Sequence, residues 1–103
     1  MGGRAGSGAG MGSRSRGYRV AAQSLYNAIG SGNKSAISKA KAKLANAISK
    51  MSTEQVKSFA ASVSDAAFFS SKKNTPKSEY SASDYKYNTT LAKMLNTEAS
   101  KRT

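Results

Sequence analysis

The sequence contains no cysteine, no histidine and no tryptophan, and its 103 residues include one proline and five acidic residues. Without thiols or imidazoles, the chain has no thiolate nucleophile, no disulfide framework and no histidine base. A zinc or iron site would have to be built from five scattered carboxylates, so we expect no metal and no cofactor. Serine is abundant, but no nucleophile elbow is present and lysine is the remaining candidate base. These absences predict a protein that is not an enzyme.

Large apolar side chains are also scarce, since Val, Ile, Leu and Phe together number 13. No window approaches the roughly 18 apolar residues of a membrane span, and the first residues hold no apolar run typical of a signal peptide. We therefore expect a protein kept inside a cell, in the bacterial cytoplasm. The 17 alanines leave room for closely packed helices. A core this small predicts marginal stability, or folding that a partner completes.

Positive charge is abundant and unevenly distributed. The chain has 17 Lys and Arg residues and a net charge of +12. Residues 1–53 hold nine basic groups and no acid, whereas residues 54–103 hold eight basic and five acidic groups. A solvated lysine face is the simple alternative, but such faces normally mix signs. The first half is therefore expected to attract a phosphate backbone without reading its sequence.

The first 17 residues have their own composition. They contain seven of the nine glycines, three arginines and no acid, so nothing offsets the entropy lost on ordering them. Residues 6–12 resemble a phosphate-binding loop in glycine content but lack the Gly-Lys-Ser/Thr of a Walker loop and the strand before a dinucleotide loop. We predict a flexible, disordered Gly/Arg-rich arm over residues 1–17.

The spacing of apolar residues in the rest of the chain, 18–103, predicts an all-α fold, a small bundle of about four short helices. Asn33 or Ser35 is expected to cap the second helix, and Ser52 with Gln55 matches a capping box for the third. The predicted helices span residues 18–29, 35–51, 53–69 and 83–98, with a basic loop over 70–80. Each helix is expected to bury one apolar stripe. In chain order, the four stripes are Tyr18, Ala22, Leu25 and Ile29; Ile37, Ala40, Leu44, Ile48 and Met51; Val56, Phe59, Ala60, Val63 and Ala67; and Tyr87, Leu91, Met94 and Leu95.

Two features near the helix ends need separate expectations. Phe68 and Phe69 lie more than a quarter turn off the stripe of the third helix, and we expect them to close the end of the core; an exposed apolar patch is the alternative. Lys101 and Arg102 follow the last helix, where cations interact favourably with its dipole.

Tyrosines lie among lysines around the predicted 70–80 loop. Tyr80, Tyr85 and Tyr87 are near Lys77 and Lys86, an arrangement that suits stacking on unpaired bases. Tyr87 has the spacing of a core residue, so Tyr85 is the better surface candidate. The predicted contacts to nucleic acid or to an acidic partner are Arg4, Arg14, Arg16, Arg19, Lys34, Lys39, Lys43, Lys50, Lys72, Lys73 and Tyr85.

The opening residues, Met1-Gly2-Gly3-Arg4-Ala5-Gly6-Ser7-Gly8, resemble the Gly/Arg/Ser-rich beginnings of small proteins of bacteriophages and other mobile elements. The resemblance covers about the first 17 residues and is compositional. It implies a virion or genome-associated protein packaged in a phage particle, or a phage-encoded inhibitor of a host nucleic-acid-guided defence of the anti-CRISPR type.

The sequence thus predicts a non-enzymatic, basic helical module that binds DNA, RNA or a nucleoprotein complex by charge. The alternative is a protein-binding or capsid component whose basic face docks on an acidic protein surface. Both hypotheses use the same lysines, and the oligomeric state stays open.

Overall fold

The structure, a computed structural model, describes the backbone of residues 9–102 and the side chains of residues 16–102. This part of the chain forms four helices and no strand. They are α1 (Ala9–Ser31), α2 (Lys34–Ser49), α3 (Thr53–Phe69) and α4 (Ala82–Lys101). The predicted all-α fold of four helices is confirmed.

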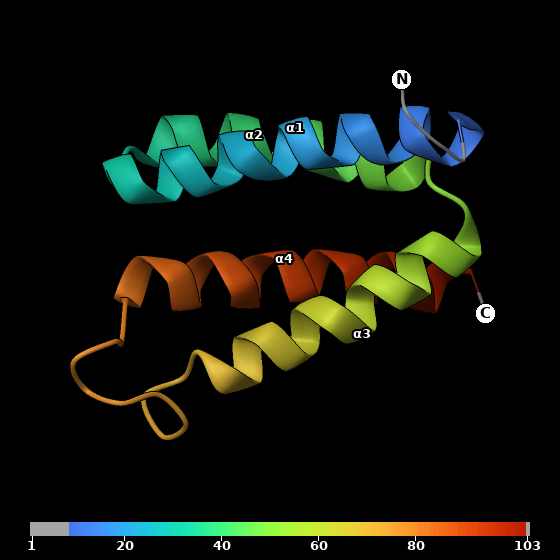
Figure 1. The fold of residues 1–103 in the computed structure, drawn as a ribbon. Coiled ribbons are helices and arrows are strands. Elements are labelled where there is room, and N and C mark those ends of the chain that lie inside the picture. The colour runs from blue at the N-terminus through green and yellow to red at the C-terminus, as the bar shows by residue number, and fades with distance from the viewer. Residues whose placement is uncertain (1–8, 103) are drawn as a thin grey trace.

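The helices form two hairpins that lie one on the other as two layers (Figure 1). α1 runs antiparallel to α2 in one layer, and α3 runs antiparallel to α4 in the other. Between the layers, contacts come mainly from α1 with α4. Residues 50–52 carry the chain from the first hairpin to the second, so this short connection fixes which helix faces meet.

The core lies between the two layers and follows the predicted stripes. The whole predicted stripe of α1 is buried. The other three stripes are buried except for Ile37, Phe59, Val63, Ala67, Tyr87 and Met94, which are half-buried. The rings of Tyr18 and Phe59 stack with centroids 4.9 Å apart and planes at 9°, which ties α1 to α3. The largest fully buried side chains are Leu25, Leu44, Ile48, Val56 and Leu95.

Local polar signals set the helix starts. Asn33 caps α2, since its side chain accepts a hydrogen bond from the Ala36 amide at 3.1 Å. Ser52 and Gln55 form the predicted capping box at the start of α3. Ser81 caps α4 in the same way, by accepting from the Asp84 amide at 3.2 Å. Each cap satisfies one amide that the first helical turn leaves without a partner.

The first helix is longer than predicted at both ends. α1 begins at Ala9, within the predicted arm, because a glycine costs a helix only about 0.5–1 kcal/mol and does not forbid it. It also continues through Gly30 to Ser31, and the residue with left-handed backbone is Gly32, at φ 71°. The remaining predicted arm residues, 1–8, lie outside the described part of the chain.

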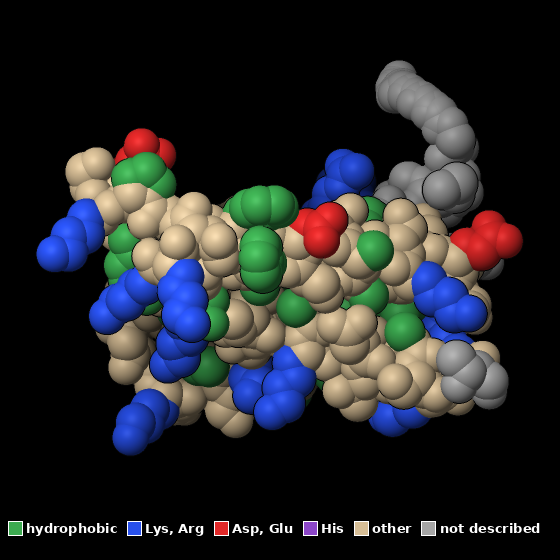
Figure 2. Space-filling view, turned by 90° about the horizontal axis from the view of Figure 1, so that it is seen from below, with side chains coloured by type: hydrophobic (Ala, Val, Ile, Leu, Met, Phe, Trp, Pro, Cys, Tyr) green, Lys and Arg blue, Asp and Glu red, His purple; other side chains and the backbone are tan. Residues whose placement is uncertain are grey.

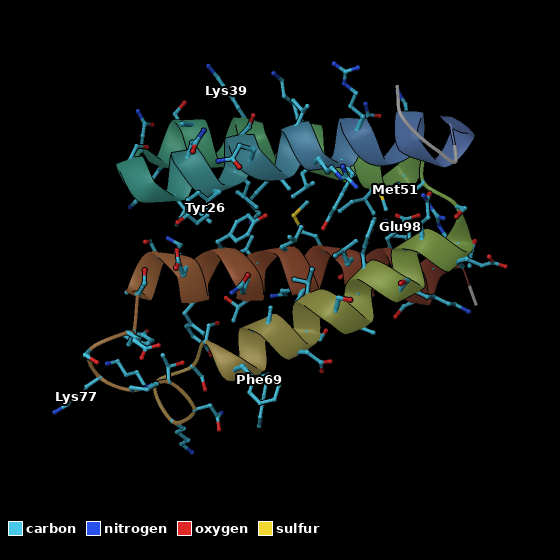
Figure 3. All side chains as sticks on the ribbon, in the orientation of Figure 1. Tyr26, Lys39, Met51, Phe69, Lys77 and Glu98 are labelled. Carbon is cyan, nitrogen blue, oxygen red and sulfur yellow. The ribbon has the colours of Figure 1, made fainter. Side chains whose placement is uncertain are left out.

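The expectation that Phe68 and Phe69 close the core is wrong. Their side chains are 59% and 65% exposed and contact each other edge to face, with centroids 5.2 Å apart. Phe69 projects from the outer side of α3, away from the first hairpin (Figure 3). The chain after α3 caps the helix rather than covering these rings, because Asn74 Nδ2 and Thr75 Oγ1 donate to the carbonyls of Phe68 and Phe69.

Arg102 has a role that its position at the end of α4 does not suggest. Its guanidinium donates to the carbonyls of Met51, Ile48 and Ser49, at 2.6, 3.1 and 3.1 Å, and forms an ion pair with Glu98 at 2.8 Å. The sequence position of Arg102 predicts a favourable interaction of this cation with the dipole of its own helix. From this position it also binds carbonyls at and just beyond the C-terminal end of α2, and it joins the two hairpins there.

Candidate nucleic-acid interface

A groove on the first hairpin brings together three of the predicted cations. Arg16 from α1, Lys43 from α2 and Lys50, the C-cap residue of α2, line this cavity of about 490 Å³ between the two helices. All three are exposed, and no carboxylate is among the lining residues. We call this the α1–α2 groove.

The helical repeat explains how the groove forms. On α1, Gly17, Ala21 and Ser24 recur at spacings of four and three. On α2, Lys43 lies two turns before the C-cap residue Lys50. Small side chains therefore form the floor, and long cationic side chains form the rim. A Cβ atom at Gly17 would meet no heavy atom within 4 Å, which shows that the groove is open above it.

The other predicted cations of the first half extend this positive surface. Lys39 points away from the second hairpin (Figure 3), and Arg19 is also exposed. Lys34 is exposed in the first turn of α2, which holds no acidic residue, and a helix dipole disfavours a cation there. Arg14 belongs to α1 but precedes the first described side chain, and Arg4 lies outside the described residues.

A second cationic site lies at the α3–α4 connection, where Lys72, Lys73 and Tyr85 come together. With Ser71 and Tyr80 they line a cleft of about 400 Å³, which we call the loop cleft. Figure 2 shows the face made by the second hairpin, with Lys and Arg side chains gathered at the end that carries this connection. The structure thus places six of the predicted contacts in two separate sites, three in the α1–α2 groove and three in the loop cleft.

Sequence reasoning missed a third cationic surface, between α2 and α4. Lys93 and Lys101 join Lys41 around a cavity of about 430 Å³ with Met94 on its wall. Lys93 and Lys101 are two turns apart on α4 and so share a face, which is the signal available in the sequence. Glu98 also lines this cavity, and its carboxylate is paired with Arg102, so the local charge is mixed.

Three tyrosines that line none of these three surfaces, Tyr18, Tyr26 and Tyr87, have a raised pKa. Burial, and then the neighbouring Tyr87, raises the pKa of Tyr18 to about 12. The pKa of Tyr26 is raised because its hydroxyl donates a hydrogen bond of 2.8 Å to the Asp84 carboxylate. Burial also raises the pKa of Tyr87. Burial and the hydrogen bond to Asp84 thus favour the neutral form of these three phenols.

No helix in the described part of the chain is long and apolar enough to cross a membrane. Comparisons with protein-family models, with curated proteins and with solved structures find no match to this chain.

Proposed function

We propose that this protein is a non-enzymatic module that binds the phosphate backbone of nucleic acid through its first hairpin. The observation that carries the proposal is the α1–α2 groove, in which Arg16, Lys43 and Lys50 converge without a carboxylate. Residues 1–53, which include both helices of this hairpin, contain no acid. A row of phosphates along such a groove displaces counterions and gains affinity without any base contact.

The lining of the groove suits a sugar–phosphate chain. Lysine and arginine on the rim reach phosphate oxygens, while Ser24 and Asn46 offer hydrogen bonds. Val20 is 62% exposed and lies on the same wall, where the apolar edge of a sugar ring would cover it. Bound phosphates would also reduce the repulsion between cations that have no acidic neighbour in their own hairpin.

The experiment replaces Lys39, Lys43 and Lys50 together with Gln and measures binding of fluorescent single- and double-stranded oligonucleotides at two salt concentrations. We expect weaker binding to every sequence and a salt dependence flatter by about 0.9 for each duplex phosphate that the variant no longer neutralises. Thermal stability should stay within about 0.5 kcal/mol for each exposed lysine replaced.

The matched control replaces with Gln three exposed lysines of the second hairpin that line none of the three cationic surfaces, Lys57, Lys77 and Lys86. This variant loses the same net charge but keeps the α1–α2 groove intact. Equal effects of the two triple variants would show that net charge, rather than the groove, binds the nucleic acid. Absence of wild-type binding at either salt concentration would contradict the proposed function itself.

A second candidate function, docking on an acidic protein, is favoured by one observation. Phe68 and Phe69 are exposed side by side, as hydrophobic anchors of a protein interface are before binding. Phe68→Ser and Phe69→Ser would weaken binding of that kind strongly, whereas phosphate binding in the α1–α2 groove, which these residues do not line, would stay unchanged. The bacteriophage setting, whether a virion protein or an inhibitor of nucleic-acid-guided defence, rests on residues 1–17 and stays a prediction.

A further inference from the structure

The loop cleft differs in chemistry from the α1–α2 groove because it contains aromatic rings. The rings of Tyr80 and Tyr85 have centroids 6.4 Å apart, with planes at 44°. Lys72 Nζ lies 5.7 Å from the centroid of the Tyr80 ring, a cation–π distance. The groove on the first hairpin has no aromatic residue in its lining. The two sites therefore suit different parts of a nucleic acid.

Local hydrogen bonds fix the backbone that carries both rings. Tyr85 lies in the first turn of α4, where its amide donates to the Ser81 carbonyl at 3.0 Å. The Tyr80 amide donates to the Pro76 carbonyl at 3.1 Å, which closes a turn just before the helix. Both tyrosines are half-buried, so part of each ring stays open to a ligand. A site built on capped ends in this way needs little ordering when a ligand binds.

The size and charge of the cleft define its ligand. Its volume of about 400 Å³ falls within the range of about 300–1,000 Å³ typical of small-ligand sites. Lys72 lies over one face of the Tyr80 ring, whereas no cation lies over the half-buried Tyr85 ring in the described part of the chain, so we assign a flat group to Tyr85. Lys73 is exposed at the same cleft and reaches a phosphate attached to that group. A nucleotide with an unpaired base combines an accessible flat ring with a phosphate, as this cleft requires.

We infer that the loop cleft binds one unpaired nucleotide, with its base stacked on Tyr85 and its phosphate beside Lys73. The inference rests on the proposed function and adds to it a preference for single-stranded nucleic acid. Bases inside a duplex are stacked on each other and cannot lie on a tyrosine, so the cleft favours single strands, whereas the α1–α2 groove accepts phosphates of either form.

The test compares Tyr85→Ala and Tyr85→Phe with wild type in binding a short fluorescent oligothymidylate and a duplex of equal length, at about 0.15 M salt. For Tyr85→Ala we expect a loss of about 5- to 150-fold in single-strand affinity, as one base–aromatic stack provides, and no change for the duplex. Tyr85→Phe keeps the ring and should bind as wild type does. Lys73→Gln, an exposed change that leaves the fold intact, should weaken single-strand binding more than duplex binding.

The outcomes separate this inference from the proposed function. If wild type binds both nucleic acids but Tyr85→Ala and Lys73→Gln leave single-strand affinity unchanged, the cleft is not a nucleotide site and the groove proposal stands. Equal losses for single strand and duplex would make the cleft a general phosphate contact and overturn the stacked base. No wild-type binding to either probe would overturn both. Circular dichroism shows whether Tyr85→Ala keeps the helical content of wild type. If this variant unfolds, the exposed change Lys73→Gln still tests the cleft.

Discussion

The two hairpins share one core but differ in charge. The first hairpin, α1 and α2, contains no acidic residue, whereas the five acids of the chain all lie at or after Glu54, in or around α3 and α4. In the second hairpin two carboxylates have partners in the structure: Glu98 pairs with Arg102, and Asp84 accepts a hydrogen bond from Tyr26. The core accounts for folding, and the unbalanced charge of the first hairpin needs a different explanation.

Self-repulsion makes that difference informative. Cations gathered without counter-charges destabilise the compact state, and this cost falls when an anion binds or when salt screens them. The imbalance is smaller in the second hairpin, because residues 54–103 hold five acidic groups among their eight basic ones. A polyanion on the first hairpin therefore stabilises the fold as well as completing the charge balance. This is why we place phosphate binding on α1 and α2 and assign a stacked base to the aromatic cleft of the other hairpin.

The largest expected effect tests the shared core. Leu44 is fully buried in the cluster that both hairpins form, so Leu44→Ala should lower the free energy of unfolding by about 2–5 kcal/mol. The neighbouring Lys43 is exposed on the groove, and Lys43→Ala should change it by less than about 0.5 kcal/mol. Thermal unfolding followed by circular dichroism compares them. Equal midpoints would show that the two hairpins do not depend on a common core.

The helix pattern and its core were within reach of the sequence because they depend on local signals. The stripe from Tyr18 to Ile29 and the caps at Asn33 and Ser52 follow from spacing and side-chain chemistry within a few residues. The exposure of Phe68 and Phe69 could not be decided from the sequence, because it depends on the path of the chain after α3. A pattern along one helix gives its faces but not the loop that covers them.

The candidate sites, too, could be predicted from the sequence only in part. The charge of the first half predicts which cations are available, but the convergence of Arg16 with Lys50 depends on how α1 lies along α2. Lys93 and Lys101 were missed because they meet Lys41 only once α4 packs beside α2. Arg102 shows the limit most clearly, since its acceptors are backbone carbonyls more than 50 residues earlier, which no side-chain pattern marks.

A smaller loss of stability is expected when the contact of Arg102 that joins the two hairpins is removed. Arg102→Ala removes three hydrogen bonds from a mostly buried guanidinium to the end of α2, and we expect a loss of about 1.5–3 kcal/mol in the free energy of unfolding. Lys93→Ala removes an exposed cation from the same helix and serves as the control, with a change below about 0.5 kcal/mol. Urea unfolding measures both. A result for Arg102→Ala no larger than the control would mean that the hairpins are held together by the apolar core alone.

The smallest effects examine the turn of the first hairpin, where two glycines two residues apart have opposite roles. Gly30 is helical and a Cβ atom there meets no heavy atom within 4 Å, so Gly30→Ala should stabilise the protein by about 0.5–1 kcal/mol. Gly32 also has open space but holds a φ of 71°, so Gly32→Ala forces a left-handed alanine and should destabilise the protein by about 1 kcal/mol. Thermal midpoints of the two variants should shift in opposite directions from wild type. If both rose, the left-handed turn at Gly32 would not be what ends α1, and the start of α2 at its Asn33 cap would need another cause.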